Sequence, residues 1–234
     1  MAAGRAQDSE KIFCKRLIRR KGMQYEIRPY RQEDRQAVRR ISCETAFPDV
    51  SSPQIFTDDE ILADALTVYF TDFEPESCFV AESAHKVVGY IIGARDVRMM
   101  RRPLFSIFFN LLKKAMRRKV IFDKVNQRFS FYFLKSLLKG EFFIPDFSRF
   151  FPSTLHINLD RNFRNGGIGK ALIDRYVRYL RGFKTPGIQV STFSVIGKGF
   201  FIKMGFRLLF SGSRSFLMPY TGKTPGYYLL GRKL

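Results

Sequence analysis

The residues most able to do chemistry lie in one stretch, residues 155–172, with the sequence LHINLDRNFRNGGIGKAL. An apolar segment, a loop with three glycines and a helical pattern follow one another there. Glycines let a ligand approach the backbone closely, and the first N–H groups of a helix favour an anion because they have no partner within the helix. This order predicts a cradle for a pyrophosphate group. The competing interpretation is a helix that begins with glycines only to pack closely on its strand.

Two better-known phosphate-binding motifs are absent from the stretch. Lys170 is not followed by Ser or Thr at the spacing of a P-loop, and the dinucleotide pattern G-x-G-x-x-G does not occur. The phosphate-binding prediction therefore rests on the order of strand, loop and helix.

Few side chains can transfer protons near neutral pH, and the chain has only two histidines, His85 and His156. His156 lies on the predicted strand that enters the loop, which makes it the first candidate for a general base. Because side chains alternate along a strand, Asn158 and Asp160 share its face and could orient water or substrate. Glu44 is a second candidate base. The alternatives are a half-buried strand histidine bonded to backbone, a solvated helix residue for Glu44, and an exposed hairpin-turn residue for His85.

Hydrophobic periodicity and turn residues indicate the elements that position these groups. Residues 78–83 and 86–95 should form an antiparallel hairpin, and a helix with an acidic first turn should follow Thr57 as its cap. A loop containing Gly, Ser and Pro should join the last two strands. Strands are also expected over residues 25–29, 154–160, 188–192, 206–211 and 227–233, and helices over residues 11–20, 33–46, 167–181 and 195–204.

The formal net charge of +20 is concentrated in two segments. Residues 1–23 form a basic tail with a net charge of +5, and residues 97–150 carry thirteen basic and three acidic residues, a net of +10. The second segment is also rich in phenylalanine, and residues 103–119 and 121–139 fit two amphipathic helices.

Four interpretations of residues 97–150 are open. They are a lid over an acceptor pocket, an element that binds an anionic membrane surface, a nucleic-acid-binding surface, and a packed helical segment with a solvated basic face. The membrane surface is favoured over nucleic acid because no nucleic-acid-binding motif is present.

Length and composition exclude several classes of protein. With 234 residues, 45% of them hydrophobic, the chain can bury a sizeable core and is not wholly disordered. It has no run of 18 apolar residues and no signal-peptide pattern at its N-terminus, so neither a transmembrane helix nor secretion is expected. Cys14, Cys43 and Cys78 are odd in number and have no metal-like spacing, so we expect no disulfide framework and a reducing cytoplasm. Packing roles are expected for Cys43 and Cys78.

The glycine loop resembles a known family. Residues 164–169, RNGGIG, fit the R/Q-x-x-G-x-G/A signature of the GNAT N-acetyltransferase superfamily at the start of a helix. Residues 27–34 (IRPYRQED), 78–96 (CFVAESAHKVVGYIIGARD) and 200–206 (FFIKMGF) resemble further parts of that family. The resemblance covers residues 24–96 and 151–234. Within it, the sequence is most similar to a bacterial subgroup related to the acetyltransferase-like domain of O-GlcNAcases.

The resemblance implies an α/β (α+β) GNAT fold. This fold has a central mixed, mostly antiparallel sheet of six to seven strands with helices on both faces. The basic helical insertion, residues 97–150, would lie between the third and fourth strands of a single domain, residues 24–234, that follows the tail. The implied function is an N-acetyltransferase that moves an acetyl group directly from acetyl-CoA to an amine acceptor of unknown type.

The family pattern also implies cofactor-binding residues. The backbone of Leu159 would bind the pantetheine arm, and Arg164 would brace the loop and add positive charge. Ser194 stands where the family commonly has an asparagine. The pyrophosphate would be held by backbone N–H groups of the loop and helix start, with a contribution from Lys170: Asn165, Gly166, Gly167, Ile168 and Gly169.

Two positions depart from the family pattern. Phe201 replaces the tyrosine that usually protonates the leaving thiolate, and Gly197 replaces a common alanine. Loss of a general acid lowers a rate by about 10²–10⁴-fold, although water can substitute for it. The competing function is therefore a non-catalytic acyl-CoA-binding or interaction module.

Overall fold

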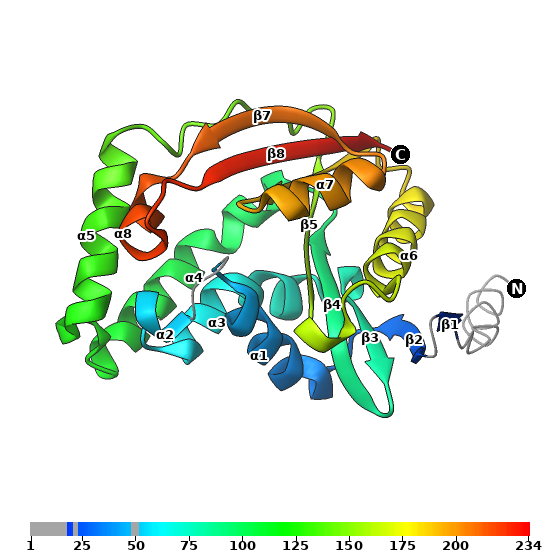
Figure 1. The fold of residues 1–234 in the computed structure, drawn as a ribbon, viewed down its shortest axis with the longest axis horizontal. Helices are drawn as coiled ribbons and strands as arrows, with labels where there is room; N and C mark the ends of the chain where they lie inside the picture. The colour runs from blue at the N-terminus through cyan, green and yellow to red at the C-terminus, as the bar shows by residue number, and fades with distance from the viewer. Residues whose placement is uncertain (1–17, 21–22, 48–51) are drawn as a thin grey trace, which may run out of the picture.

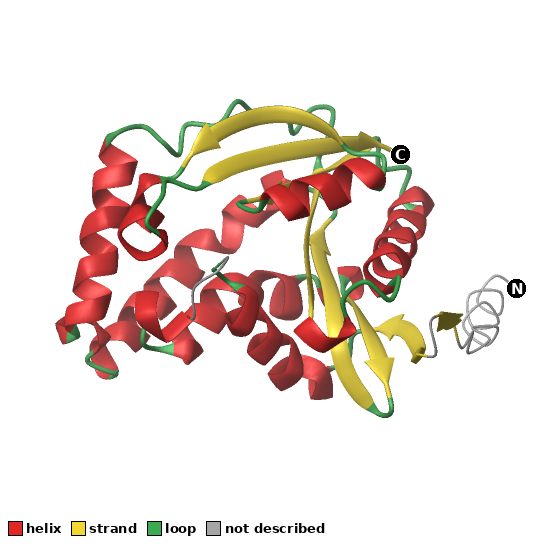
Figure 2. Ribbon diagram, in the orientation of Figure 1, coloured by secondary structure: helices red, strands yellow, loops and turns green. Residues whose placement is uncertain are grey.

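A mixed sheet of eight strands forms the centre of the computed structural model, which describes residues 18–20, 23–47 and 52–234 (Figures 1 and 2). The strand order is β1-β2-β3-β4-β5-β6-β8-β7. Every neighbouring pair is antiparallel except β5 and β6, which are parallel. The strands are β1 (Ile18–Arg20), β2 (Met23–Pro29), β3 (Phe79–Ser83), β4 (Lys86–Ala94), β5 (Ser153–Leu159), β6 (Gly187–Thr192), β7 (Arg207–Ser213) and β8 (Gly226–Lys233).

Helices cover both faces of the sheet, as predicted. On one face, α1 (Arg35–Thr45) packs against β4 and β5, and α3 (Asp59–Val68) packs against α1. On the other face lie α6 (Ile168–Gly182) and α7 (Val195–Lys203), which share the main hydrophobic core. Alternate residues of β4 serve the two faces, because Ile91 belongs to the α6 core whereas Tyr90 and Ile92 belong to the α1 core.

Helix α6 follows its sequence pattern closely. Its buried apolar residues recur at helical spacing, and Leu172, Ile173, Tyr176 and Leu180 have no exposed surface. Tyr176 also fixes the helix to the sheet, because its hydroxyl donates to the carbonyl oxygen of Thr154 at 3.0 Å. The helix that carries the glycine loop is therefore held rigidly against β5.

Two helices lie between β4 and β5, α4 (Val97–Arg117) and α5 (Lys124–Leu138). The first begins before the predicted residue 103, because the Asp96 carboxylate accepts the N–H of Arg98 at 2.9 Å and caps an earlier turn. Pro103 consequently lies inside α4. The Asp123 side chain caps α5 in the same way, accepting from the N–H of Val125 at 2.9 Å.

Helix α5 is attached to the rest of the molecule by a polar contact and a small core. Buried Asn126 donates to the Thr57 hydroxyl at 2.8 Å and accepts from the Thr57 N–H at 2.9 Å. Phe129 packs in a cluster with Ile55 of α2 (Ser52–Ile55) and with Phe216. Phe216 belongs to the connection between β7 and β8. The sequence indicated only a loop there, but the connection contains a 3₁₀ turn, Ser215–Leu217, and α8 (Met218–Thr221).

Two other expectations from the sequence were wrong in detail. Ile18–Arg20 is a strand rather than helix, because its backbone pairs with β2, and this edge strand raises the sheet to eight strands. The rest of the helix expected over residues 11–20 lies outside the described residues, as does Cys14. The cap of α3 is Asp58, whose carboxylate accepts the N–H of Ile61 at 3.0 Å, and not Thr57, which bonds Asn126 instead. In the part of the chain that the structure describes, no helix combines the length and apolar character needed to cross a bilayer.

Candidate active site

The sheet has a seam between β5 and β6. These two strands pair in parallel over only two residue pairs, Ser153 with Ile188 and Thr154 with Gln189. On the other side of β5, the N–H of Asp160 donates to the carbonyl oxygen of Val88 at 2.9 Å, and alternate residues of an antiparallel ladder point the same way. The backbone N–H and C=O of Leu159 therefore point away from β4, toward the seam. This edge can accept an extended ligand that carries amide groups, as the family pattern requires of Leu159.

The glycine loop opens directly onto the start of α6. Gly167 is the N-terminal cap residue, with φ of 86°, and Asn165 also has a positive φ, of 63°. Ala171 is the first residue whose N–H bonds back into the helix, to the carbonyl oxygen of Gly167 at 3.1 Å. Within the described residues, the N–H groups of Ile168 and Gly169 have no acceptor. The predicted cradle thus has the unpaired donors that an anion needs.

Gly169 lies where three elements meet. A Cβ atom at this position would lie 3.1 Å from the Phe200 ring of α7 and 3.6 Å from the Leu159 side chain of β5. The glycine therefore has a packing role as well, because it lets α7 approach the start of α6. The structure supports the packing interpretation, and the anion cradle stays a prediction that the uncovered N–H groups at the start of α6 allow.

The charged side chains of the loop differ in their surroundings. Lys170 forms an ion pair with Asp174 at 2.7 Å on the exposed side of α6. The Arg164 side chain is exposed and forms no hydrogen bond or ion pair within the part of the chain that the structure describes. Arg164 is thus a cation of this loop that is available to a bound anion.

His156 and Asn158 lie together on the face of β5 that carries α1. Their side chains are 3.3 Å apart, from His156 Nε2 to Asn158 Nδ2, and Asn158 also donates to the Tyr90 hydroxyl at 2.8 Å. Burial lowers the pKa of His156 to about 4, so the imidazole is neutral at physiological pH. The predicted shared face is present, and it consists of a neutral histidine, an amide and a buried tyrosine.

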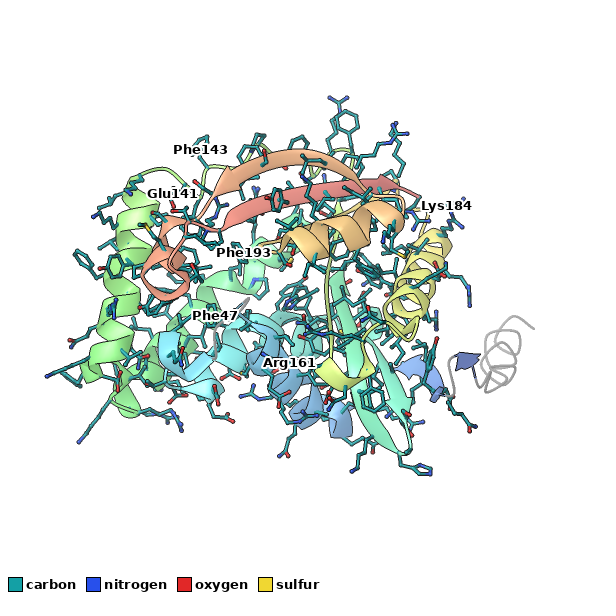
Figure 3. All side chains as sticks on the ribbon, in the orientation of Figure 1. Phe47, Glu141, Phe143, Arg161, Lys184 and Phe193 are labelled. Atoms are coloured by element: carbon teal, nitrogen blue, oxygen red, sulfur yellow. The ribbon has the colours of Figure 1, made fainter. Side chains whose placement is uncertain are left out.

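Asp160 follows β5 and lies at the edge of a separate groove. Its carboxylate caps the next turn by accepting the N–H of Asn162 at 3.0 Å, and it lies 3.9 Å from Arg40 Nη1. Arg40 also bonds Glu44 at 3.1 Å, so both predicted acidic residues line one groove of about 1310 Å³ beside α1 and α3. Figure 3 labels Arg161, which lines this groove next to Asp160.

Ser194 and Phe201 both belong to the β6–α7 segment. Ser194 caps α7, because its hydroxyl accepts the N–H of Gly197 at 3.2 Å. Phe201 is 5% exposed and its ring contacts those of Phe200 and Phe206. A phenyl ring packed in the main core thus occupies the position of the family's tyrosine.

The surroundings of the remaining candidates, His85, Cys43 and Cys78, give none of them a catalytic role. His85 is fully exposed in the β3–β4 turn. Burial raises the pKa of the Cys43 thiol to about 12 and that of the Cys78 thiol above its usual range, so neither is an activated nucleophile.

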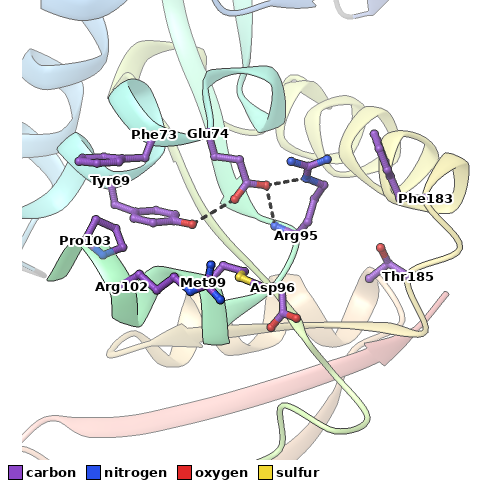
Figure 4. Close-up of a pocket in the computed structure, with 10 residues that line it drawn as sticks. All are labelled: Tyr69, Phe73, Glu74, Arg95, Asp96, Met99, Arg102, Pro103, Phe183 and Thr185. Carbon is purple, nitrogen blue, oxygen red and sulfur yellow. Dashed lines mark hydrogen bonds and ion pairs between the residues drawn. The ribbon is translucent and has the colours of Figure 1, made fainter.

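A second hollow, of about 720 Å³, lies at the opposite end of α6 from the glycine loop, beside Phe183 and the start of α4 (Figure 4). Its buried carboxylate, Glu74, accepts from the Tyr69 hydroxyl at 3.2 Å and from Arg95 Nε at 3.0 Å. No residue predicted for the active site lines this hollow. The Glu74 carboxylate is already paired with Arg95.

Sequence reasoning missed three residues that shape the site: Tyr90, Phe200 and Arg40. Tyr90 bonds Asn158 only because β4 and β5 pair in one particular register, Tyr90 opposite Asn158. Phe200 is near Gly169 only through the packing of α7 on α6. Alternation along the hairpin tells which face of the sheet Tyr90 lies on. Its hydrogen-bond partner, Asn158, belongs to a strand more than sixty residues away in sequence, so no local pattern reveals it.

Comparisons with known proteins bear on the fold. No protein-family model and no curated protein matches the sequence. Among solved structures, the protein called SsHAT is 23% identical with a TM-score of 0.66, over 89% of this chain and 98% of its own. A polyamine N-acetyltransferase from Drosophila melanogaster that forms N-acetylagmatine is 14% identical with a TM-score of 0.55, over 90% of this chain and all of its own (100%).

A third similar structure is an acetyltransferase of the GNAT family from Streptococcus pneumoniae. It is 16% identical with a TM-score of 0.51, over 90% of this chain and 99% of its own. These proteins share the sheet and helix arrangement described above over nearly their whole length. The chain therefore has the GNAT acetyltransferase fold.

Proposed function

We propose that the protein is an N-acetyltransferase that uses acetyl-CoA and an amine acceptor. The observation that carries the proposal is the placement of two features side by side. The seam edge of β5 ends at Leu159, and the Leu159 side chain lies next to Gly169 at the start of α6. One elongated ligand with amide groups at one end and a pyrophosphate at the other fits both features.

The chain's own residues fit acetyl-CoA in three respects. The seam edge at Leu159 suits the amides of a pantetheine arm, and the open N–H groups of Ile168 and Gly169 suit a pyrophosphate. Arg164 adds an available positive charge beside them. When bound, acetyl-CoA supplies an activated acetyl thioester. By the family pattern, Ser194 is proposed as a further cofactor contact beside its role as the cap of α7.

Proton handling is assigned to the α1 face of β5. His156 is neutral, and a base with a pKa of about 4 takes a proton from an ammonium group weakly. Asn158 and Asp160 are assigned to orienting the amine or a water beside it. We therefore expect the rate to follow the deprotonation of the amine itself, rising with pH without an inflection near pH 6.5.

The acceptor is assigned to the groove that Glu44 and Asp160 line. Carboxylates favour a cationic amine, and the polyamine acetyltransferase named above makes polyamines and agmatine the first acceptors to test. We also propose the relation to the bacterial O-GlcNAcase-like subgroup, on the sequence that flanks α4 and α5.

A second candidate function is a non-catalytic acyl-CoA-binding module. Phe201 is buried where the family has a tyrosine, and its phenyl ring has no proton to donate to the leaving thiolate. This position favours the module without catalysis. The two functions differ in turnover alone, since both bind the same ligand at the same site.

The test is release of CoA thiol by the full chain with acetyl-CoA and a panel of primary amines, including agmatine, polyamines and peptides. We expect thiol release above the rate without acceptor for at least one amine. Thermal stabilisation by acetyl-CoA with no release for any amine would favour the binding module. Failure of acetyl-CoA to stabilise the protein would contradict both functions.

A further inference from the structure

The outward side of α4 carries an unpartnered apolar row. Phe105, Phe109, Leu112 and Met116 follow one another at intervals of three and four residues and so share one side of the helix. Their exposures are 72%, 50%, 42% and 59%. No residue of α4 is buried, although the helix is 21 residues long. Leu104 and Phe108 of the same helix are also exposed, and a contiguous exposed apolar patch of this kind marks a contact site.

The orientation of α4 is fixed, so the apolar row cannot turn inward. The opposite side of the helix packs against α3, where Ile107 and Leu111 are partly buried. Lys114 extends from that side and forms an ion pair with Asp64 of α3 at 2.6 Å. In Figure 1, α4 runs alongside α3. The phenylalanine row therefore faces away from the protein.

Basic residues border the apolar row on a helix without a single acidic residue. Helix α4 contains six basic residues, and of these Arg101, Arg102, Lys113 and Arg117 are exposed close to the row. Arg101 lies 3.8 Å from Asp146, whereas the other three form no ion pair within the described residues. Phe122, in the turn that follows the helix, is also 70% exposed.

We propose that α4 binds the surface of an anionic lipid bilayer, lying in the plane of the interface. The phenylalanine row would enter the boundary between headgroups and acyl chains, and the basic border would contact anionic headgroups. Charge complementarity favours this occupant over a second copy of the chain, because two identical basic borders would repel each other. Nucleic acid would satisfy the charges and leave the phenylalanines exposed to water.

The proposal is independent of the acetyl-transfer site. The apolar row and the glycine loop lie on different elements. The inner side of α4 contributes Lys114 to the groove beside α1 and α3, whereas the apolar row lies on the opposite side of the helix. Lipid binding therefore needs no acetyl-CoA, and acetyl-CoA binding needs no lipid.

The test is co-sedimentation of the full chain with vesicles of equimolar phosphatidylcholine and phosphatidylserine, against vesicles of phosphatidylcholine alone. One variant removes the basic border and another shortens the apolar row. The first changes Arg101, Arg102, Lys113 and Arg117 to Gln, and the second combines Phe105→Ser with Phe109→Ser. A matched control removes four exposed basic residues from other elements, by changing Arg178, Arg181, Lys184 and Lys203 to Gln.

We expect the wild type to bind only the anionic vesicles. Each basic residue near such a surface contributes about 1 kcal/mol, so the first variant should bind at least about 100-fold more weakly. The second variant should also lose binding, whereas the control should lose much less. All variants should keep the melting temperature of the wild type and its stabilisation by acetyl-CoA, which separates failure of this proposal from failure of the proposed function.

Four results would overturn the proposal. The first is a wild type that does not bind anionic vesicles at moderate salt. The second is unchanged vesicle binding by the phenylalanine variant, which would show charge attraction without insertion. The third is loss, in that variant, of a dimer detected by sedimentation of the wild type without lipid, which would assign the row to a second copy. Binding of duplex DNA but not vesicles would assign the basic border to nucleic acid.

Discussion

Helices α6 and α4 are both amphipathic, but the structure uses their apolar sides in opposite ways. Helix α6 buries seven of its 15 residues against the sheet, and α4 buries none of its 21. The apolar side of α6 faces β3 and β4, while the phenylalanine row of α4 faces solvent. The comparison shows that a periodic pattern identifies an apolar side without identifying what covers it.

The position of each helix explains the difference. Helix α6 connects the parallel strands β5 and β6, so it must pack on one face of the sheet. Its apolar side therefore has a single surface to cover. Helix α4 lies outside α3, with its inner side already occupied by partly buried residues and the Lys114–Asp64 ion pair. Its phenylalanines are a second apolar side, for which the chain supplies no partner among the described residues.

The largest expected effect is on stability, when the same truncation is made on the two helices. Leu172 on α6 is fully buried and Leu112 on α4 is 42% exposed. Leu172→Ala should lower the free energy of unfolding by about 2–5 kcal/mol because it leaves a cavity. Leu112→Ala should change it by less than about 0.5 kcal/mol. Urea unfolding measures both, and equal losses would show that α4 is packed in solution.

The next effect concerns the loop at the start of α6. Gly167→Asp puts a negative charge at the predicted anion cradle, in a backbone conformation with φ of 86°. Acetyl-CoA at 100 times its dissociation constant stabilises the native state by about 2.7 kcal/mol, and the variant should lose this stabilisation. Gly182→Asp is the matched control, because it adds the same charge at the other end of α6 in open space. Equal thermal shifts for both variants would remove the cradle from the proposed function.

Acid should destabilise the sheet region through His156. Its pKa is about 4 in the folded protein and about 6.5 when unfolded, so the unfolded state binds more protons between these values. Stability is therefore unaffected above pH 6.5 and falls by roughly 1–3 kcal/mol as the pH drops to 4. His156→Gln should remove this part of the pH dependence. His85→Gln should keep it, because His85 is fully exposed. A pH series of urea unfolding curves that is unchanged in His156→Gln would contradict the assignment.

The smallest expected effect is on turnover. Phe201→Tyr restores the family's general acid and should raise the rate of thiol release about tenfold, or about 1.4 kcal/mol, because water already serves as a weaker acid. Phe206→Tyr is the control, because Phe206 is another ring buried in the same core. If thiol release is faster in both variants, or in neither, position 201 is not the site of the general acid.

The sequence was enough to locate most elements, because their signals are local. The glycine loop, the α6 pattern and the β3–β4 hairpin each depend on residues within one or two elements, and the structure places them as predicted. The sequence places the start of α4 too late, because a proline such as Pro103 favours the first turn of a helix, whereas here it lies inside one. A capping aspartate, Asp96, determines the start instead. The short strand β1 was missed because its pairing with β2 outweighs its helical pattern.

The site was less predictable than the fold. Alternation placed His156 and Asn158 on one face correctly, but it could not show that their partner is Tyr90 or that burial makes His156 a weak base. Asp160 was expected beside them, yet it leaves the strand to cap a turn and lines the groove with Glu44. Such contacts depend on strand register and on burial, which no local pattern specifies.

The short parallel pairing of β5 and β6 also divides the sheet mechanically. Five strands lie on one side of it and three on the other, joined at the sheet level by two residue pairs. Along β5 the amides of His156 and Asn158 are held by β4, whereas those of Ile157 and Leu159 face the seam. Amide hydrogen exchange of the ligand-free protein should therefore alternate between slow and fast from one residue to the next. A ligand that bridges the seam should slow the exchange of the seam-facing amides alone. It would then hold the five-stranded and three-stranded parts of the sheet together.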